Sequence, residues 1–229
     1  MYYQITQSIY FTSILVAFLT SLTAYSRFNK TTYLKYFAPF LLITLGVEVA
    51  AKIIEERSGN NQYLFNFFSV LGFMFYFFIL YKGITNLIMK RIILGLIVIY
   101  PLFAFYIIFF VQGVYVFHTI SFGIGALLIV LICIFYFKWQ FFETPIEVDI
   151  RRDPLVFICL GLVLFHTITF TYFSGIHFFK GLSTSFVRNM TLVCMICNYA
   201  LYAFFTVAFL VNHKYSKIEF VEFPEIPKL

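Results

Sequence analysis

Residues 115–137, YVFHTISFGIGALLIVLICIFYF, decide the fold class, because they contain no Asp, Glu, Lys or Arg. An α-helix of this length spans about 34 Å, which is enough to cross the ~30 Å hydrocarbon core of a bilayer. The rest of the 229-residue chain has the same character, since 62% of its residues are hydrophobic and only 11% are charged. A soluble domain carries about 25% charged residues. The composition therefore predicts an integral membrane protein.

Seven apolar runs are long enough to form transmembrane helices. They cover residues 5–26, 34–54, 62–83, 90–111, 115–137, 154–175 and 189–212. We therefore predict an all-α membrane protein with one seven-helix transmembrane domain, residues 1–212, and a short cytoplasmic tail, residues 213–229. The first run has neither a basic start nor a small-residue cleavage site, so we expect a retained helix and not a signal peptide.

The Lys and Arg residues between these runs predict the orientation. If the N-terminus is outside, twelve of the sixteen Lys and Arg residues fall in cytoplasmic segments and four in outer segments. Short cytoplasmic loops carry such an excess of positive charge. We therefore predict that the N-terminus lies outside and the C-terminus inside. An odd number of helices also argues against the simple inverted repeat of many transporters.

In this orientation the polar side chains within the runs gather toward the outer side. The candidates for a binding site are Glu48, Asn66, His118, His166 and Asn198. Ionisable groups are costly in lipid and usually face the interior of a helix bundle. We therefore predict a polar pocket that opens outward and binds a small or lipid-like ligand.

Each candidate also has a structural alternative. Glu48 lies four residues before Lys52, which is the favourable order for an ion pair on a helix. A protonated Glu48 bonded to a neighbouring helix is a second alternative. The alternative for Asn66 is a cap or a bond to the second loop, and the alternative for His118 is an interfacial position near a helix end. Asn198 has a residue type that commonly hydrogen-bonds one membrane helix to another.

Three classes of function are not predicted. The net charge of +6 does not indicate nucleic-acid binding, because the basic residues form short clusters between apolar runs. Cys194 and Cys197 form a C-x-x-C inside an apolar run, where we expect neither a disulfide framework nor a redox site. Glu48, His118 and His166 have zinc-binding side chains, but they come from three runs and share no ligand spacing. We therefore predict no metal and no cofactor.

Two local patterns concern packing and capping. Ser121 and Gly125 are four residues apart and suit close helix contact. Pro154 suits the first turn of the sixth helix, with Asp153 as its N-cap. The inner loop between the fifth and sixth runs is typical of a charged connector at the membrane surface, and the tail of a loosely ordered terminus. Docking of a partner is the alternative for both segments.

Three stretches carry a resemblance: VQGVYVFHTISFGIGALLIVLICIFYF (111–137), RRDPLVFICLGLVLFHTITF (151–170) and NYALYAFFTVAFL (198–210). The chain resembles a family of small seven-helix membrane proteins of Bacteroidota. The resemblance implies a multi-pass protein of the bacterial inner membrane and a link to sensor histidine kinases. It assigns no role to Glu48 or His118.

Three functions remain open from the sequence. The favoured one is a receptor-like or sensory module that signals to a sensor kinase or another membrane partner. The second is an intramembrane enzyme that acts on lipid, with Glu48 or a histidine as general base. The third is a structural or assembly subunit whose polar groups join helices. The sequence predicts neither an oligomeric state nor the identity of the ligand.

Overall fold

A computed structural model describes residues 2–26, 31–142, 150–175 and 184–222. Seven long helices account for most of these residues, and no strand occurs among them. The helices are α1 (Tyr2–Ser21), α2 (Phe37–Ser58), α3 (Gln62–Gly83), α4 (Leu87–Tyr106), α5 (Thr119–Phe142), α6 (Pro154–Gly175) and α7 (Thr184–Glu222). Within the described residues, seven helical spans are long and apolar enough to cross a membrane. The predicted all-α, seven-helix class is therefore confirmed.

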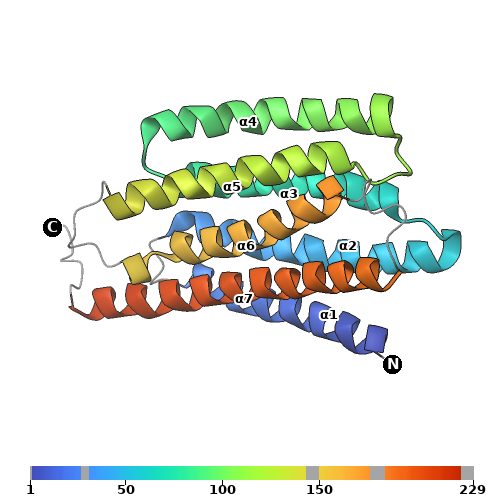
Figure 1. The fold of residues 1–229 in the computed structure, drawn as a ribbon. Helices are drawn as coiled ribbons and strands as arrows, with labels where there is room; N and C mark the ends of the chain where they lie inside the picture. Colours follow the sequence, from blue (N-terminus) through green and yellow to red (C-terminus); the bar gives the residue numbers. More distant parts are fainter. Residues whose placement is uncertain (1, 27–30, 143–149, 176–183, 223–229) are drawn as a thin grey trace.

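Six of the helices form a ring and the seventh lies outside it. Helix α1 packs against α2 and α7, and α6 packs between α5 and α7. Helix α3 closes the ring by contacting both α2 and α5. Helix α4 lies along α3 and α5 at the edge of the bundle (Figure 1). The ring therefore encloses an interior, and α4 packs against its outside through buried side chains such as Tyr100.

The two ends of the bundle differ in their connections and are named here by one residue each. The Gly59 end holds the α2–α3 and α4–α5 connections, and the Asp153 end holds the α3–α4 connection and the start of α6. At the Gly59 end, Gly59 adopts the left-handed conformation, with a φ of 72°, and its N–H donates to the Glu55 carbonyl. This cap ends α2 and lets the chain reverse into α3.

The start of α6 shows the capping that the sequence predicts. The Asp153 Oδ1 accepts a hydrogen bond of 2.8 Å from the Leu155 N–H, and its Oδ2 accepts one of 2.6 Å from the Tyr136 hydroxyl. The Asp153 cap is therefore confirmed. Helix α4 begins in the same way, because the Asn86 Oδ1 accepts hydrogen bonds from Ile88 N and Met89 N.

Several helix boundaries differ from the sequence prediction; α5, for example, covers Thr119–Phe142 and not residues 115–137. The fourth apolar run ends in a π-helical turn, Ile107–Gln112, and Gly113 ends it with a φ of 89°. Helix α7 continues to Glu222, ten residues past the expected end at residue 212. No Gly or Pro occurs after residue 212 until Pro224, so no helix-breaking residue stops it earlier. Of the predicted tail, residues 223–229 lie outside the described residues.

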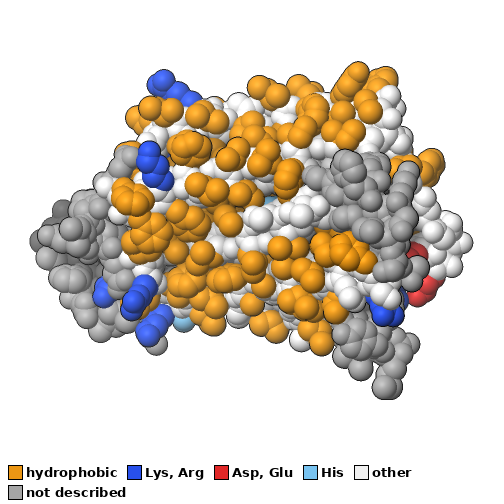
Figure 2. All heavy atoms as spheres, viewed as in Figure 1, with side chains coloured by type: hydrophobic (Ala, Val, Ile, Leu, Met, Phe, Trp, Pro, Cys, Tyr) orange, Lys and Arg blue, Asp and Glu red, His pale blue; other side chains and the backbone are white. Residues whose placement is uncertain are grey.

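The outer surface of the bundle suits a lipid environment. Hydrophobic side chains cover most of the face seen in Figure 2, while Lys and Arg side chains gather mainly at the Asp153 end.

Close packing inside the bundle uses Gly125, as the sequence predicts. A Cβ atom at this position would lie 2.7 Å from the Tyr100 hydroxyl oxygen and 2.9 Å from the Phe73 ring.

Candidate functional site

A cavity of about 240 Å³ lies inside the ring of helices, in the half of the bundle near the Gly59 end. Its lining comes from α1, α2, α3, α5, α6 and α7 and from the short segment before α5. Eleven of the nineteen lining residues are Phe or Tyr. The walls are therefore largely aromatic, and a few polar side chains must provide any directional binding.

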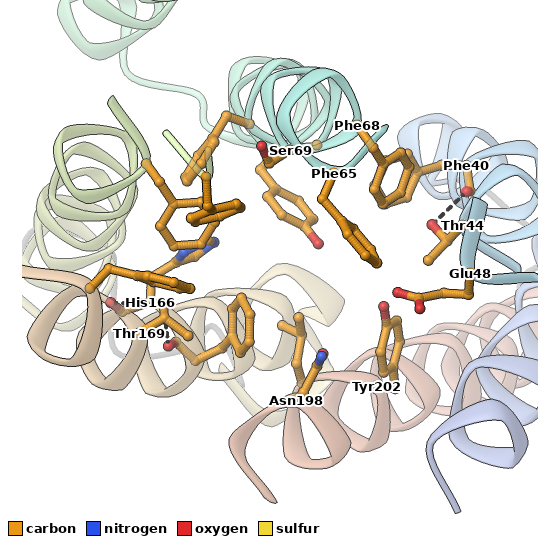
Figure 3. A pocket seen from close by; sticks show the side chains of 18 of the residues that line it. Phe40, Thr44, Glu48, Phe65, Phe68, Ser69, His166, Thr169, Asn198 and Tyr202 are labelled. Atoms are coloured by element: carbon orange, nitrogen blue, oxygen red, sulfur yellow. Dashed lines mark hydrogen bonds between the residues drawn. The ribbon is translucent and has the colours of Figure 1, made fainter. Parts of the chain in front are cut away.

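Glu48 lies on α2 and points into the cavity (Figure 3). Its Oε1 accepts a hydrogen bond of 2.7 Å from the Tyr10 hydroxyl on α1. Lys52 is exposed, and no ion pair joins it to Glu48 in the described part of the chain. Of the two structural alternatives for Glu48, the ion pair is therefore absent among the described residues, while a bond to a neighbouring helix, α1, is present.

His166 lies on α6 on the opposite side of the cavity from Glu48 (Figure 3). Its side chain is only 2% exposed, and within the described residues neither ring nitrogen has a hydrogen-bonding partner. The neighbouring groups are aromatic rings, with the Phe73 and Phe165 centroids 5.2 and 5.1 Å from the imidazole. A buried polar group without a partner costs about 1–3 kcal/mol, so this arrangement requires an explanation.

Asn198 lies on α7 between these two residues in Figure 3, and its amide points into the cavity. It is half-buried and forms no hydrogen bond with another described residue. Tyr202, one turn further along α7, presents its hydroxyl to the same cavity. Three of the five predicted binding residues, Glu48, His166 and Asn198, are therefore brought together around one space.

The other two predicted binding residues, Asn66 and His118, do not line the cavity. Both are fully buried. The Asn66 Nδ2 donates hydrogen bonds of 2.8 Å to the carbonyls of Val114 and Val116, and its Oδ1 accepts one of 3.1 Å from the His118 N–H. Asn66 therefore fastens the chain that precedes α5 to α3.

The His118 ring extends this network. Its Nδ1 lies 2.5 Å from the Ser121 Oγ, and its Nε2 is hydrogen-bonded to the Ser69 Oγ. We call Asn66, Ser69, His118 and Ser121 the polar staple. Ser69 also lines the cavity, so the staple forms part of the structure behind the cavity wall. Asn66 and His118 lie apart from the cavity because their side chains hydrogen-bond backbone groups and serine hydroxyls of the protein itself, and these bonds hold them between α3 and the start of α5.

Sequence reasoning missed several lining residues, above all Tyr10 and Tyr202. The chain contains 34 Phe and 17 Tyr residues, so an aromatic side chain on a given helix carries little positional information. One signal was present, because Tyr202 lies four residues after Asn198 and therefore shares its helix face. Tyr10 has no comparable local signal.

The cysteines are the remaining candidate groups from the sequence. Cys133, Cys159, Cys194 and Cys197 are free thiols. Among the residues that the structure describes, no group of three or more His, Cys, Asp or Glu side chains is arranged to hold a metal ion. Comparisons with protein-family models, with curated proteins and with solved structures find no match to this chain.

Proposed function

We propose that this protein is a receptor-like membrane protein whose cavity binds a small ligand and whose helices pass the binding event to a membrane or cytoplasmic partner. One observation carries the proposal: three polar side chains on three helices line one aromatic cavity, and each has hydrogen-bonding capacity that no described residue uses. Glu48 has one bonded carboxylate oxygen, and His166 has two unpartnered ring nitrogens. A ligand that supplies the missing partners recovers the free energy that this burial costs.

The size of the cavity favours a small molecule over a whole lipid. Pockets for drug-sized ligands have volumes of about 300–1,000 Å³, and this cavity measures about 240 Å³. The aromatic walls suit an apolar or aromatic body, while the polar side chains suit a few hydrogen-bonding groups. Both features are typical of specific small-molecule sites.

The proposal includes the predicted orientation in a bacterial inner membrane, with the N-terminus outside. The concentration of Lys and Arg at the Asp153 end supports it, since cytoplasmic ends carry the excess of positive charge. The Gly59 end then faces outward, and the cavity lies in the outer half. Helices α6 and α7 both line the cavity and run to the cytoplasmic end, where a sensor kinase is one partner class that the proposal allows.

A ligand screen on the purified full-length protein tests the proposal. Thermal stability is measured against a library of small metabolites for the wild type, Glu48→Gln, His166→Phe and Asn198→Leu. We expect some compounds to raise the Tm of the wild type, and the cavity substitutions to reduce or abolish these shifts. Glu56→Gln is the matched control, because Glu56 is an exposed carboxylate on the same helix. Equal shifts in the wild type and all three cavity variants would contradict the proposal.

A second candidate function has one specific observation in its favour. Glu48 and His166 line the same cavity, so a carboxylate and an imidazole are both available as general base for a lipid-acting enzyme. General acid–base groups contribute about 10²–10⁴-fold to rate. Lipid turnover by the purified protein that falls at least about 10²-fold in both Glu48→Gln and His166→Phe would favour this candidate. Ligand-induced stabilisation without turnover would favour the receptor.

A further inference from the structure

We infer that the ligand of this cavity is a small organic ammonium compound, with its cationic group near Glu48 and a hydrogen-bonding group near His166 and Asn198. This inference rests on the proposed function and adds the chemical class of the ligand. It follows from the distribution of charge, of aromatic rings and of unpartnered polar atoms around the cavity.

The charge of the lining is one-sided. Among the residues that the structure describes, Glu48 is the only Asp or Glu that lines the cavity, and no Lys or Arg does so. The nearest Lys in the sequence, Lys52, is exposed to the surroundings of the bundle. A buried carboxylate keeps its negative charge at low cost only when it is paired or fully hydrogen-bonded, and the Tyr10 hydroxyl bonds just one of its oxygens. A ligand cation supplies the missing counter-charge, and a charge-assisted hydrogen bond is stronger than a neutral one.

Aromatic rings surround the same end of the cavity. Figure 3 shows Phe65 and Tyr202 directed toward the space that the Glu48 carboxylate enters. The Tyr10 and Tyr202 rings lie 6.1 Å apart, and the lining residues Phe40 and Phe68 stack at 6.1 Å. Rings attract an ammonium group through the negative potential of their faces, and sets of rings around a carboxylate suit quaternary or primary ammonium groups. No cationic side chain of the described residues lines this space.

The opposite side of the cavity supplies different chemistry. The two His166 nitrogens offer one donor and one acceptor in the neutral imidazole, and the Asn198 amide offers both as well. The hydroxyls of Thr44 and Thr169 are already bonded to carbonyls of their own helices. A carbonyl or ether group on the ligand, which needs a donor, would therefore bind His166 and Asn198 in preference to the threonines.

Other ligand classes fit these groups less well. An anion would meet the Glu48 carboxylate and no positive side chain. A purely apolar ligand, such as a lipid tail, would fill the aromatic space but leave the carboxylate oxygen and both imidazole nitrogens without partners. Each such unmet group carries a desolvation cost. An ammonium compound with one further polar group satisfies all of them.

Matched pairs of probes test the inference. The pairs are choline with 3,3-dimethyl-1-butanol, and 2-phenylethylamine with 2-phenylethanol; within each pair the compounds have similar shape and differ in charge. Binding to the detergent-solubilised full chain is measured by calorimetry and by thermal shift. For at least one pair we expect the ammonium member to bind about tenfold more tightly than its neutral partner. We expect Glu48→Gln to remove most of this preference and Glu56→Gln to retain it.

A second variant tests the inference in case Glu48→Gln fails to fold. Phe65→Leu keeps an apolar side chain but removes a ring face, and we expect it to weaken ammonium binding about fivefold while leaving neutral binding nearly unchanged. Equal affinity within both pairs, or a preference that survives in Glu48→Gln, would overturn the inference. If neither ammonium probe binds but neutral or anionic library compounds do, the inference fails and the proposed function stands. If no compound of any class binds, both fail.

Discussion

The polar staple and the cavity lie side by side near the Gly59 end, and they use similar residues in opposite ways. In the staple, every polar group of Asn66 and of the His118 ring has a partner at hydrogen-bonding distance. In the cavity, Asn198 and His166 are the same residue types without partners among the described residues. Side-chain type therefore does not separate the two regions, but hydrogen-bond satisfaction does.

This difference assigns different roles to the two regions. Polar groups that are satisfied inside the chain stabilise it and lose free energy when they are removed. Polar groups that are buried but unsatisfied cost free energy in the empty protein, and that cost is tolerated where a ligand or a reaction uses them. The same substitution is therefore expected to change stability differently in the two regions.

The largest expected effect separates the two asparagines. Asn66→Ala removes two hydrogen bonds donated to carbonyls and one accepted from the His118 N–H. We expect it to lower the free energy of unfolding by about 3 kcal/mol, since hydrogen bonds between membrane helices contribute about 0.6–1.7 kcal/mol each. Asn198→Ala removes none, and we expect a change below about 1 kcal/mol. Denaturation in mixed micelles measures both; equal losses would break the distinction.

The two histidines give the next effect, and here the expected signs are opposite. His118→Phe removes the ring's hydrogen bonds to Ser69 and Ser121, and we expect a loss of about 1–2 kcal/mol. His166→Phe removes two unpartnered nitrogens from a pocket of aromatic rings. We expect this variant to be unchanged or more stable by about 1 kcal/mol in the absence of ligand. Thermal melting of both variants in one detergent provides the measurement, and a large loss in His166→Phe would show that a structural partner holds its ring.

A smaller effect concerns the hydrogen bond between the Tyr10 and Glu48 side chains, which both line the cavity. Tyr10→Phe keeps the ring but removes the hydroxyl that donates to Glu48. We expect a loss of about 1 kcal/mol, intermediate between those of the staple and of the unpartnered groups. Tyr25→Phe is a suitable control, because the Tyr25 hydroxyl donates to the Lys35 carbonyl at an exposed position. If Tyr10→Phe matches this control in Tm, the bond to Glu48 contributes nothing to folding.

The same comparison explains how far the sequence could predict this molecule. The seven helices follow from local information, since each apolar run by itself has the length to cross a bilayer. The depth of Glu48, His166 and Asn198 also follows from their positions along the runs. Whether a side chain faces a cavity depends on the rotation of each helix about its axis. It also depends on where loops lie, and neither property is local.

Asn66 and Ser69 show this limit within one turn of α3. They are three residues apart, yet the Asn66 side chain bonds the chain before α5, while Ser69 contacts both His118 and the cavity. That chain segment is placed by the positive φ of Gly113 and by Asn66 itself. The periodicity of an apolar sequence rich in Phe carries no signal for this arrangement.

Lys52 provides the smallest effect and the most direct test of a local rule against a tertiary contact. Spacing on the helix predicts a Glu48–Lys52 pair, but Glu48 instead bonds Tyr10, which is 38 residues away in the sequence. A partly buried hydroxyl on a neighbouring helix competes well with an exposed ammonium, which is hydrated and loses side-chain entropy when it pairs. We therefore expect Lys52→Ala to leave both the Tm and the ligand-induced shift unchanged. A loss of stability that disappears in the Glu48→Gln background would instead reveal an ion pair, and the carboxylate would then no longer be open to a cationic ligand.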